Sequence, residues 1–263
     1  MTGINQYWQV YRLKFSNAFA QLMSFRINFV LTVLVDIAHF ATVFLTVQFL
    51  FNHVERIGPW GKNEFMFFIC FIQSMDFIHS GMVAPNFWNF SDKLKTGKLD
   101  FRLLRPIGSL FDTFTAIMRP TSLCLVFLPL GVLIYYGIKL QLSWLSWVLL
   151  PVLFVQSFIL VILIELSIAL GMFWTIQGDG VNFVRLQTQR LKKWPDFIYQ
   201  PIFRKFFTFF IPLLAVGSYP VQFLLNNSLW PGVLMLTLAI VVFWFLVSRI
   251  WALGLARYDS ASS

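Results

Sequence analysis

Long apolar stretches recur along this chain, and they constrain its fold more than any other feature. Five mostly apolar runs occur near residues 27–51, 65–88, 115–137, 145–174 and 232–254, and a sixth near 206–225 is interrupted by Pro212 and Pro220. About 20 helical residues cross a hydrocarbon core about 30 Å thick. Because lipid offers the backbone no hydrogen-bond partners, such runs must be helical. The sequence therefore predicts an all-α polytopic membrane protein with six transmembrane helices.

Composition supports the lipid bilayer as a partner. The chain is 58% hydrophobic and only 12% charged, whereas a soluble protein is about 25% charged. A soluble chain of 263 residues has too little interior to bury this much apolar surface. The net charge of +9 would suit nucleic-acid binding in a soluble protein. Here we attribute it to membrane topology and expect no nucleic-acid partner.

The basic residues indicate which way the chain crosses the membrane. Of the 20 lysines and arginines, 17 fall before the first run, in the second and fourth connections, after the last run, or near the adjoining ends of the third and sixth runs (Arg119 and Arg249). Cytoplasmic connections carry such an excess of positive charge. We therefore expect a multi-pass protein of the bacterial cytoplasmic (inner) membrane with both termini in the cytoplasm.

The segment before the first run has a helical pattern. Residues 1–26 are expected to form an amphipathic interface helix that lies along the membrane surface, while residues 27–263 form the transmembrane domain. The apolar side chains share one helical face and are Ile4, Tyr7, Trp8, Tyr11, Phe15, Phe19 and Leu22. The alternative is an N-terminal extension that packs on its own loops.

Three connections are long enough to have structure. Residues 89–114 and the basic loop 175–205 are expected in the cytoplasm. Residues 218–231, which contain proline and asparagine, are expected on the external side. No nucleotide-binding loop, nucleophile motif or zinc-binding motif occurs in the sequence. We therefore predict no catalytic residue, no metal site and no cofactor in this chain, so any active transport must draw on an ion gradient or a separate subunit.

Ionisable residues inside the apolar runs are the first candidate site. Intramembrane charges are costly and tend to face the interior of a helix bundle. Two Asp-x-x-His pairs place an acid and an imidazole one helical turn apart, and an acid occupies the fourth run; together they are Asp36, His39, Asp76, His79 and Glu165. Three interpretations stay open: hydrogen bonds that fix helix packing, a hydrated patch along a translocation path, and a metal or proton-relay site.

The loop at residues 89–114 is the second candidate site. Gly97 is expected to end one short helix, and Pro106 to end the next. Leu99, Leu103 and Leu104 form an apolar stripe between charged neighbours, as in a helix that docks into a partner's groove. A solvated membrane-surface loop is the alternative. The candidate docking residues are Lys95, Gly97, Lys98, Leu99, Asp100, Leu103, Leu104, Arg105 and Pro106.

This loop carries a resemblance to a known family. The stretch Gly97-Lys-Leu-Asp-Phe-Arg-Leu-Leu-Arg-Pro106 resembles the G-x-L-D-x-x-L-x-R-P signature of type-2 ABC transporter permeases, especially a subgroup of paired six-span permeases. The dipeptides Ile211-Pro212 and Tyr219-Pro220 are similar to the family's IP and YP pairs. The family pattern does not explain the acids and histidines of the first two runs.

The resemblance implies a function and several partners. It implies the permease subunit of an ATP-driven exporter, with ATP and Mg bound by a separate cytoplasmic ATP-binding subunit and a second permease, the same chain or a related one, completing a dimer. The helix near residues 93–106 would be the coupling helix, and residues 218–231 the external re-entrant hairpin. Aromatic-rich spans suit an amphiphilic or lipid-like substrate. The alternative is a gradient-driven transporter or a metal-dependent intramembrane enzyme built on the Asp/His pairs.

Overall fold

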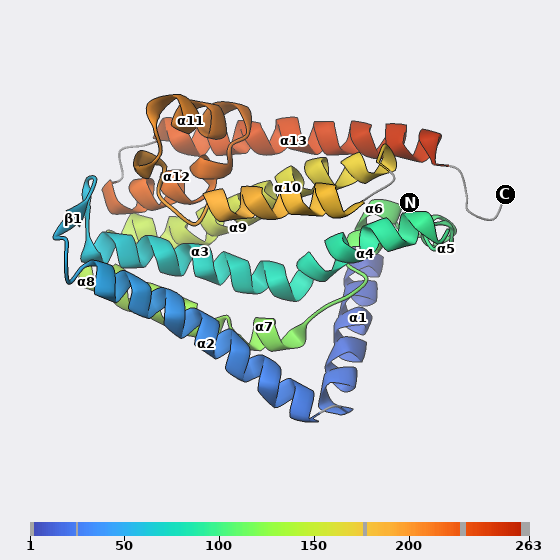
Figure 1. Ribbon diagram of the computed structural model, residues 1–263, viewed down its shortest axis with the longest axis horizontal. Helices are drawn as coiled ribbons and strands as arrows, with labels where there is room; N and C mark the ends of the chain where they lie inside the picture. The colour runs from blue at the N-terminus through green and yellow to red at the C-terminus, as the bar shows by residue number, and fades with distance from the viewer. Residues whose placement is uncertain (1–2, 25, 176–177, 227–229, 259–263) are drawn as a thin grey trace.

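The computed structural model of the protein describes residues 3–24, 26–175, 178–226 and 230–258. Helices account for most of this part of the chain, with one short hairpin between the second and third helices (Figure 1). The longer elements are α1 (Ile4–Ser24), α2 (Arg26–Leu50), α3 (Lys62–Met82), α4 (Ala84–Lys95), α8 (Phe127–Lys139), α9 (Trp144–Ala169), α10 (Gly178–Leu191), α12 (Leu213–Asn226) and α13 (Trp230–Arg257). The shorter ones are β1 (Arg56–Ile57), β2 (Trp60–Gly61), α5 (Asp100–Leu103), α6 (Ser109–Phe114), α7 (Pro120–Leu125), η1 (Leu170–Phe173), η2 (Asp196–Ile198), α11 (Pro201–Lys205) and the π-helix η3 (Phe206–Phe210).

Five segments of the described chain are long and apolar enough to cross a membrane. They are Arg26–Leu50, Lys62–Lys95, Pro120–Lys139, Trp144–Phe173 and Trp230–Arg257. A sixth exists if Pro201–Phe210 and Leu213–Asn226, which meet at an angle of 91°, count as one broken span. The structure thus confirms an all-α membrane protein with five or six spans.

Helix α3 lies at the centre of the bundle. Every residue from Phe65 to Met75 is buried, and α7, α8, α9, α12 and α2 all contact the helix. Its sequence explains this position, because a helix that is apolar on all sides is stable only when it is covered on all sides. Gly217 of α12 helps α12 to approach closely: a side chain there would collide with Phe68 and Ile72 of α3.

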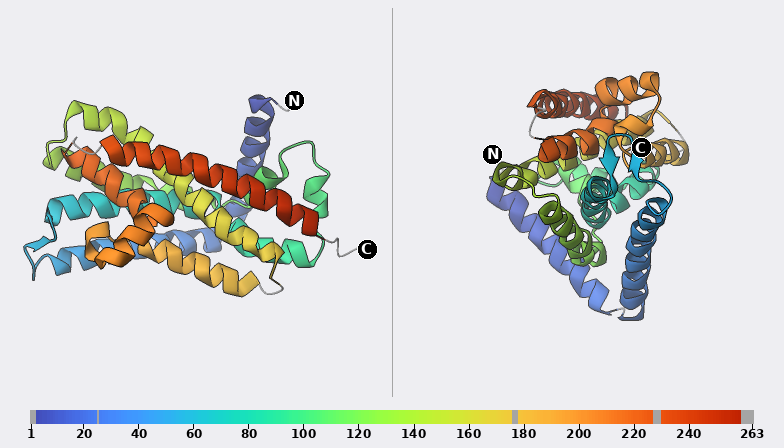
Figure 2. Two further views of the ribbon diagram at one scale, coloured as in Figure 1. Left: turned by 90° about the horizontal axis from the view of Figure 1, so that it is seen from above. Right: turned by 90° about the vertical axis from the view of Figure 1, so that its left-hand side faces the viewer.

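Helices α2 and α13 lie at the periphery. Apolar side chains such as Val35, Phe49 and Leu234 are more than half exposed, as expected for helices that face lipid. Figure 2 shows α13 running along the length of the molecule, and its right-hand view shows α1 and α2 set apart from α12 and α13. Helix α1 runs steeply across the bundle axis and forms a V with α2 (Figure 1).

The bundle has two distinct ends. The loop end holds α5 and α6, together with the start of α1 and the end of α13 (Figure 1). The hairpin end holds β1 and β2, which pair in antiparallel fashion. A pocket of about 510 Å³ at the hairpin end is lined by Trp60, Leu140, Phe197 and Asn226, so three chain connections meet there.

The predicted break in the fifth apolar run is present, but the described residues of the hairpin expected at 218–231 are parts of two long helices. The chain turns at Ile211-Pro212, where η3 ends and α12 begins. Residues 218–226 continue α12 as helix, with Pro220 inside it. Residues 227–229 lie outside the described chain. The turn therefore comes earlier than predicted, because Pro212 lacks the backbone N–H that would continue the preceding helix.

Residues 175–205 also depart from the prediction of a loop on the same side as 89–114. Helix α10 packs along α9, α4 and α12. Beyond it, the Trp194 ring lies near the Phe65 ring, with centroids 6.2 Å apart, and the Phe197 ring lies 4.9 Å from the Trp60 ring of the hairpin. This part of the chain therefore passes from the loop end to the hairpin end. Two of the basic side chains that suggested a solvated loop, Arg185 and Lys192, are paired with acids inside the bundle.

Candidate coupling loop and intramembrane polar residues

The loop between α4 and α7 takes its shape from a glycine and a proline. Gly97 has a φ of +68°, a backbone conformation that glycine adopts without steric penalty. The turn that it makes lets the Leu99 N–H donate a hydrogen bond to the Lys93 carbonyl at 3.2 Å. Helix α5 then spans one turn and ends before Pro106. The predicted pair of short helices separated by Gly97 is therefore present.

The predicted docking residues divide into exposed and buried members. Leu104 is 82% exposed and Leu103 39%, whereas Leu99 is fully buried in a cluster with Phe90 and Trp251. The prediction of one apolar stripe is therefore wrong at Leu99, which anchors the loop to the bundle. Phe101, 69% exposed, takes its place on the outer surface. The other exposed candidates are Lys95, Lys98, Arg105 and Pro106, while Gly97 is buried and Asp100 half-buried.

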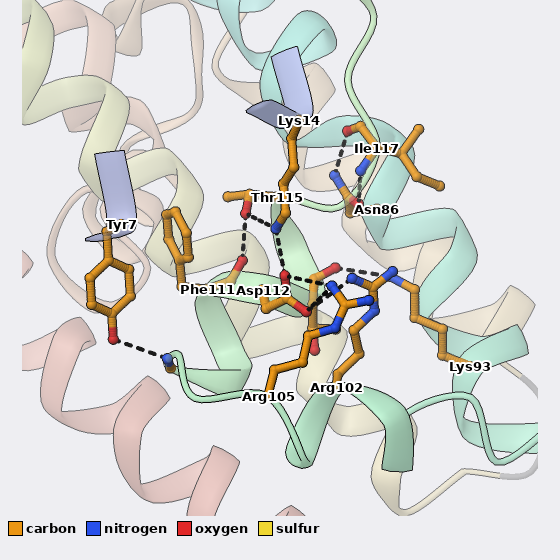
Figure 3. Close-up of polar contacts among 12 residues, drawn as sticks. Tyr7, Lys14, Asn86, Lys93, Arg102, Arg105, Phe111, Asp112, Thr115 and Ile117 are labelled. Atoms are coloured by element: carbon orange, nitrogen blue, oxygen red, sulfur yellow. Dashed lines mark hydrogen bonds and ion pairs between the residues drawn. The ribbon is translucent and has the colours of Figure 1, made fainter. Parts of the chain in front are cut away.

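Asp112 of α6 is the centre of a charge cluster that the sequence did not reveal. Its carboxylate is fully buried and lies 2.6 Å from Lys14 Nζ, 2.9 Å from Arg102 Nη1 and 3.2 Å from Arg105 Nη1. These side chains come from α1, α5 and the residues after α5, and they converge on Asp112 in Figure 3. One carboxylate thus joins the N-terminal helix to the candidate coupling helix.

A second set of contacts holds α1 against the same loop. The Gly108 N–H donates a hydrogen bond to Tyr7 Oη at 3.0 Å, and the Tyr7 ring packs edge-on against Phe111 with centroids 5.1 Å apart. Figure 3 shows both Tyr7 and Lys14 reaching the loop from α1. The predicted N-terminal helix therefore packs on the coupling loop over two helical turns.

Helix α4 holds the other side of the loop. Asn86 makes two hydrogen bonds with the Ile117 backbone, one to the carbonyl and one from the N–H, both at 2.8 Å. Lys93 is buried and donates from Nζ to the Thr113 carbonyl at 2.9 Å. Because α4 begins two residues after α3 ends, these hydrogen bonds connect the loop to the continuation of the central helix.

Charge pairing outweighs burial in setting the protonation state of Asp112. Burial by itself would raise the pKa of Asp112, but the hydrogen bonds and charges of Lys14 and Arg102 outweigh it and lower that pKa below its ordinary value. Burial lowers the pKa of Lys14, and the bond to Asp112 partly offsets this effect. Asp112 is therefore a carboxylate at neutral pH.

The intramembrane acids and histidines fall into two groups rather than one. The first group lines a cavity of about 170 Å³ between α2 and α3, to which Asp36, His39 and Asp76 all contribute. Asp36 accepts a hydrogen bond from Ser122 Oγ at 3.0 Å. Asp76 lies 2.7 Å from Lys192 Nζ. The predicted meeting of the first two spans at similar depth is thus present for these three residues.

The second group is a buried network at His79, one helical turn after Asp76 along α3. Glu165 of α9 is fully buried, and one of its oxygens lies 2.6 Å from His79 Nε2. The other oxygen accepts hydrogen bonds from Gln189 and from Arg185 Nη1, the latter at 3.4 Å. The Arg185 guanidinium also lies over the Phe87 ring, 4.7 Å from its centroid. The network connects α3, α9, α10 and α4.

The cations that complete both groups come from α10 and its end, which the sequence prediction had assigned to a cytoplasmic loop. Arg185, Gln189 and Lys192 recur at the spacing of one helical face, and that face points into the bundle. Phe183 and Val184, on the outer side, are 61% and 52% exposed. The sequence did contain a signal for these partners. Intramembrane acids require partners, and Arg185, Gln189 and Lys192 form a basic helical face that could supply them.

The described residues contain no group of three or more His, Cys, Asp or Glu side chains placed to hold a metal ion. Lysine, arginine and glutamine face Asp76 and Glu165 instead. The five residues predicted as one cluster are thus divided between the cavity at Asp36 and the pair of His79 with Glu165.

Of three comparisons with known proteins, one identifies the family of the chain. A search of curated proteins and a search of solved structures found no match. The family model described as ABC-2 family transporter protein matches residues 37–262, which include all of the candidate coupling loop and every long helix after the first two. The chain therefore belongs to the ABC-2 transporter family, whose permeases form the membrane component of a transporter and generally work with an ATP-binding subunit.

Proposed function

We propose that this chain is the permease subunit of an ATP-driven exporter and that the loop 89–114 is its docking site for a separate ATPase. The observation that carries the proposal is the surface formed by Phe101, Leu103 and Leu104. These apolar side chains protrude at one end of the bundle, while Leu99 and Asp112 hold the loop rigidly beneath them. A rigid apolar projection on a short helix suits insertion into a groove of a partner.

The contacts beneath the loop suggest how the ATPase acts on the spans. Closure of two ATPase subunits on ATP and Mg would move the two coupling loops of a permease dimer together. Lys93 and Asn86 would pass that movement to α4 and α3, and Asp112 would pass it to α1. The dimer could hold two copies of this chain or a related second chain. This mechanism places the loop end and both termini in the cytoplasm of a bacterial cell.

The proposed substrate is amphiphilic or lipid-like. The cavity lined by Asp36, His39 and Asp76 opens between the peripheral helix α2 and the central helix α3, where a molecule could enter from the bilayer. We propose this cavity as part of the translocation path, and the His79–Glu165 network as the structural support behind it.

The docking proposal is tested by a double substitution, Leu103→Asp with Leu104→Asp. Two carboxylates on the exposed surface should reduce ATPase association by roughly 30-fold or more, since loss of an interface hot spot costs about 2 kcal/mol or more. The measurement is co-purification with the cognate ATPase and stimulation of its ATP hydrolysis.

Two control substitutions test whether the loss of ATPase association is specific to the apolar surface of the loop. Leu104→Met keeps the apolar surface and should retain the ATPase. Val54→Asp adds a carboxylate at a partly exposed apolar position at the hairpin end and should also retain it. If the double variant folds and still binds and stimulates the ATPase like the original protein, the loop is not the docking site.

A further inference from the structure

Two cavities adjoin one another between α2, α3 and the segment after α10. The polar cavity, of about 170 Å³, is lined by Asp36, His39, Gln73, Asp76, Ser122 and Lys193. The apolar cavity, also of about 170 Å³, is lined by Thr46, Val47, Ile69, Ile72 and Trp194. Gln73 and Lys193 contribute to both cavities. Together they form one elongated site with a charged half and an apolar half.

The charged half contains groups that the protein leaves incompletely paired. Asp76 is neutralised by Lys192 at 2.7 Å, whereas Lys193 Nζ is 3.9 Å from Asp76 and 41% exposed. Among the described residues, no basic side chain lies within 4.0 Å of Asp36, which accepts one hydrogen bond from Ser122. The cavity therefore presents one carboxylate and one ammonium group that are both available to a ligand.

Gln73 supplies an independent indication of a ligand. Its side chain is 3% exposed, and its Nε2 has no hydrogen-bond partner among the described residues. A buried amide donor without a partner is costly, and natural proteins usually satisfy such a group with water or a ligand. Because Gln73 lines both halves of the site, the missing acceptor would lie at the boundary between them.

We infer that this elongated site binds a single-chain amphiphile whose head group is zwitterionic, with a primary amine and a phosphate. The ammonium of the ligand pairs with Asp36, its phosphate accepts hydrogen bonds from Lys193 and Gln73, and its tail fills the apolar half. This charge arrangement neutralises the two incompletely paired groups without breaking the Asp76–Lys192 pair. The inference rests on the proposed transport function and specifies the chemistry of its substrate.

The test measures binding to the purified full chain in an uncharged detergent, without any ATPase. Three probes are compared by native mass spectrometry and thermal unfolding: lysophosphatidylethanolamine, lysophosphatidylglycerol with the same tail, and phosphorylethanolamine without a tail. The first should bind at least about tenfold more tightly than either of the others, since a charge-assisted hydrogen bond or a buried tail contributes at least that much.

Substitutions locate the bound molecule. Asp36→Asn and Lys193→Gln should each weaken lysophosphatidylethanolamine binding by about tenfold, and Lys193→Arg should restore it. Thr46→Trp should block the apolar half. The Leu45 side chain on the same helix is 62% exposed, so Leu45→Trp should have no effect on binding. Glu55→Gln and Lys139→Gln are charge-matched controls at exposed positions and should bind normally.

The outcomes separate this inference from the docking proposal. Equal binding of the phosphatidylglycerol probe, or binding that survives Thr46→Trp in a folded protein, would overturn the assignment of the site. Because the measurement involves no ATPase, such a result would leave the docking proposal standing. Conversely, loss of ATPase association in the docking experiment has no bearing on whether the head group binds at Asp36.

Discussion

At the scale of single residues, Asp112 does the most to shape the candidate coupling site. Its buried carboxylate faces Lys14, Arg102 and Arg105 within 3.2 Å, so three cations from separate parts of the chain share one anion. Removing one member of a buried pair costs more than the pair itself contributes, because the remaining charges stay buried without a partner. The cluster should therefore be sensitive to loss of Asp112 and tolerant of changes among its exposed neighbours.

Asp112→Asn is expected to lower the free energy of unfolding by about 2–4 kcal/mol and to make α1 susceptible to cleavage after Arg12 and Lys14. Thermal unfolding in detergent and limited trypsin digestion measure the two effects. The matched control is Asp92→Asn, whose pair with Lys98 is exposed on both sides and should contribute less than about 1 kcal/mol. Similar effects of the two substitutions would show that Asp112 has no special role.

The difference between the original protein and Asp112→Asn should also depend on pH. Because pairing lowers the pKa of Asp112 in the folded state, the stabilisation is fully present above the ordinary aspartate pKa of about 3.9. It is lost as pH falls through the lower, folded-state pKa. The stability difference should therefore be constant from about pH 7 to pH 5 and shrink only below about pH 4. A difference that disappears near pH 6 would contradict this assignment.

At the scale of elements, α10 and the residue that follows it supply basic side chains to the acids in the bundle interior. Its polar face points inward, while Phe183 and Val184 are exposed on the outer side, which is the reverse of a helix on a soluble protein. Two ion pairs hold it, one from Arg185 to Glu165 and one from Lys192 to Asp76. Loss of these pairs should release α10 from the bundle, since its own sequence contributes little apolar surface to the core.

A double-mutant cycle tests how α10 is held. Glu165→Gln should destabilise the protein by about 3–5 kcal/mol because Arg185 is left buried without its anion. Adding Arg185→Gln should restore part of the loss, with a coupling energy of about 1–3 kcal/mol between the two positions. Thermal unfolding of the four proteins in one detergent provides the measurement. Strictly additive effects would mean that the two side chains do not act as a pair.

At the scale of the whole molecule, the segment after α10 determines how the two ends of the bundle are connected. Phe197 packs against Trp60, and a side chain on Gly58 would collide with Phe197. The basic residues of 175–205 therefore cannot all be assigned to the same side of the membrane as the loop end. Lysines and arginines that pair with intramembrane acids are neutralised inside the bundle, so they carry little weight in the positive-inside rule.

Cysteine labelling tests this arrangement. In a protein with Cys70→Ala and Cys124→Ala, the single substitutions Glu55→Cys and Ile198→Cys should react with a membrane-impermeant maleimide from the same side of sealed vesicles. Lys98→Cys should react only from the opposite side. All three positions are exposed. Labelling of Ile198→Cys from the same side as Lys98→Cys would contradict the path of the chain from α10 to the hairpin.

The sequence by itself determined the features that depend on local physics. The length of the apolar runs predicted the long helices, Pro212 predicted the break in the fifth run, and Gly97 predicted the turn before α5. Each of these follows from membrane thickness or from backbone geometry within a few residues. The resemblance carried by Gly97–Pro106 led to the family that residues 37–262 match.

Only the tertiary structure decided which distant residues become partners. It divided the predicted acid–histidine cluster into a cavity at Asp36 and a network at Glu165, brought α10 inside the bundle, and joined α1 to the loop through Asp112. Charge pairing between residues about 20 to 120 positions apart depends on how helices pack, and no local pattern encodes that packing. A basic stretch looks the same in sequence whether water solvates its charges or a buried carboxylate neutralises them.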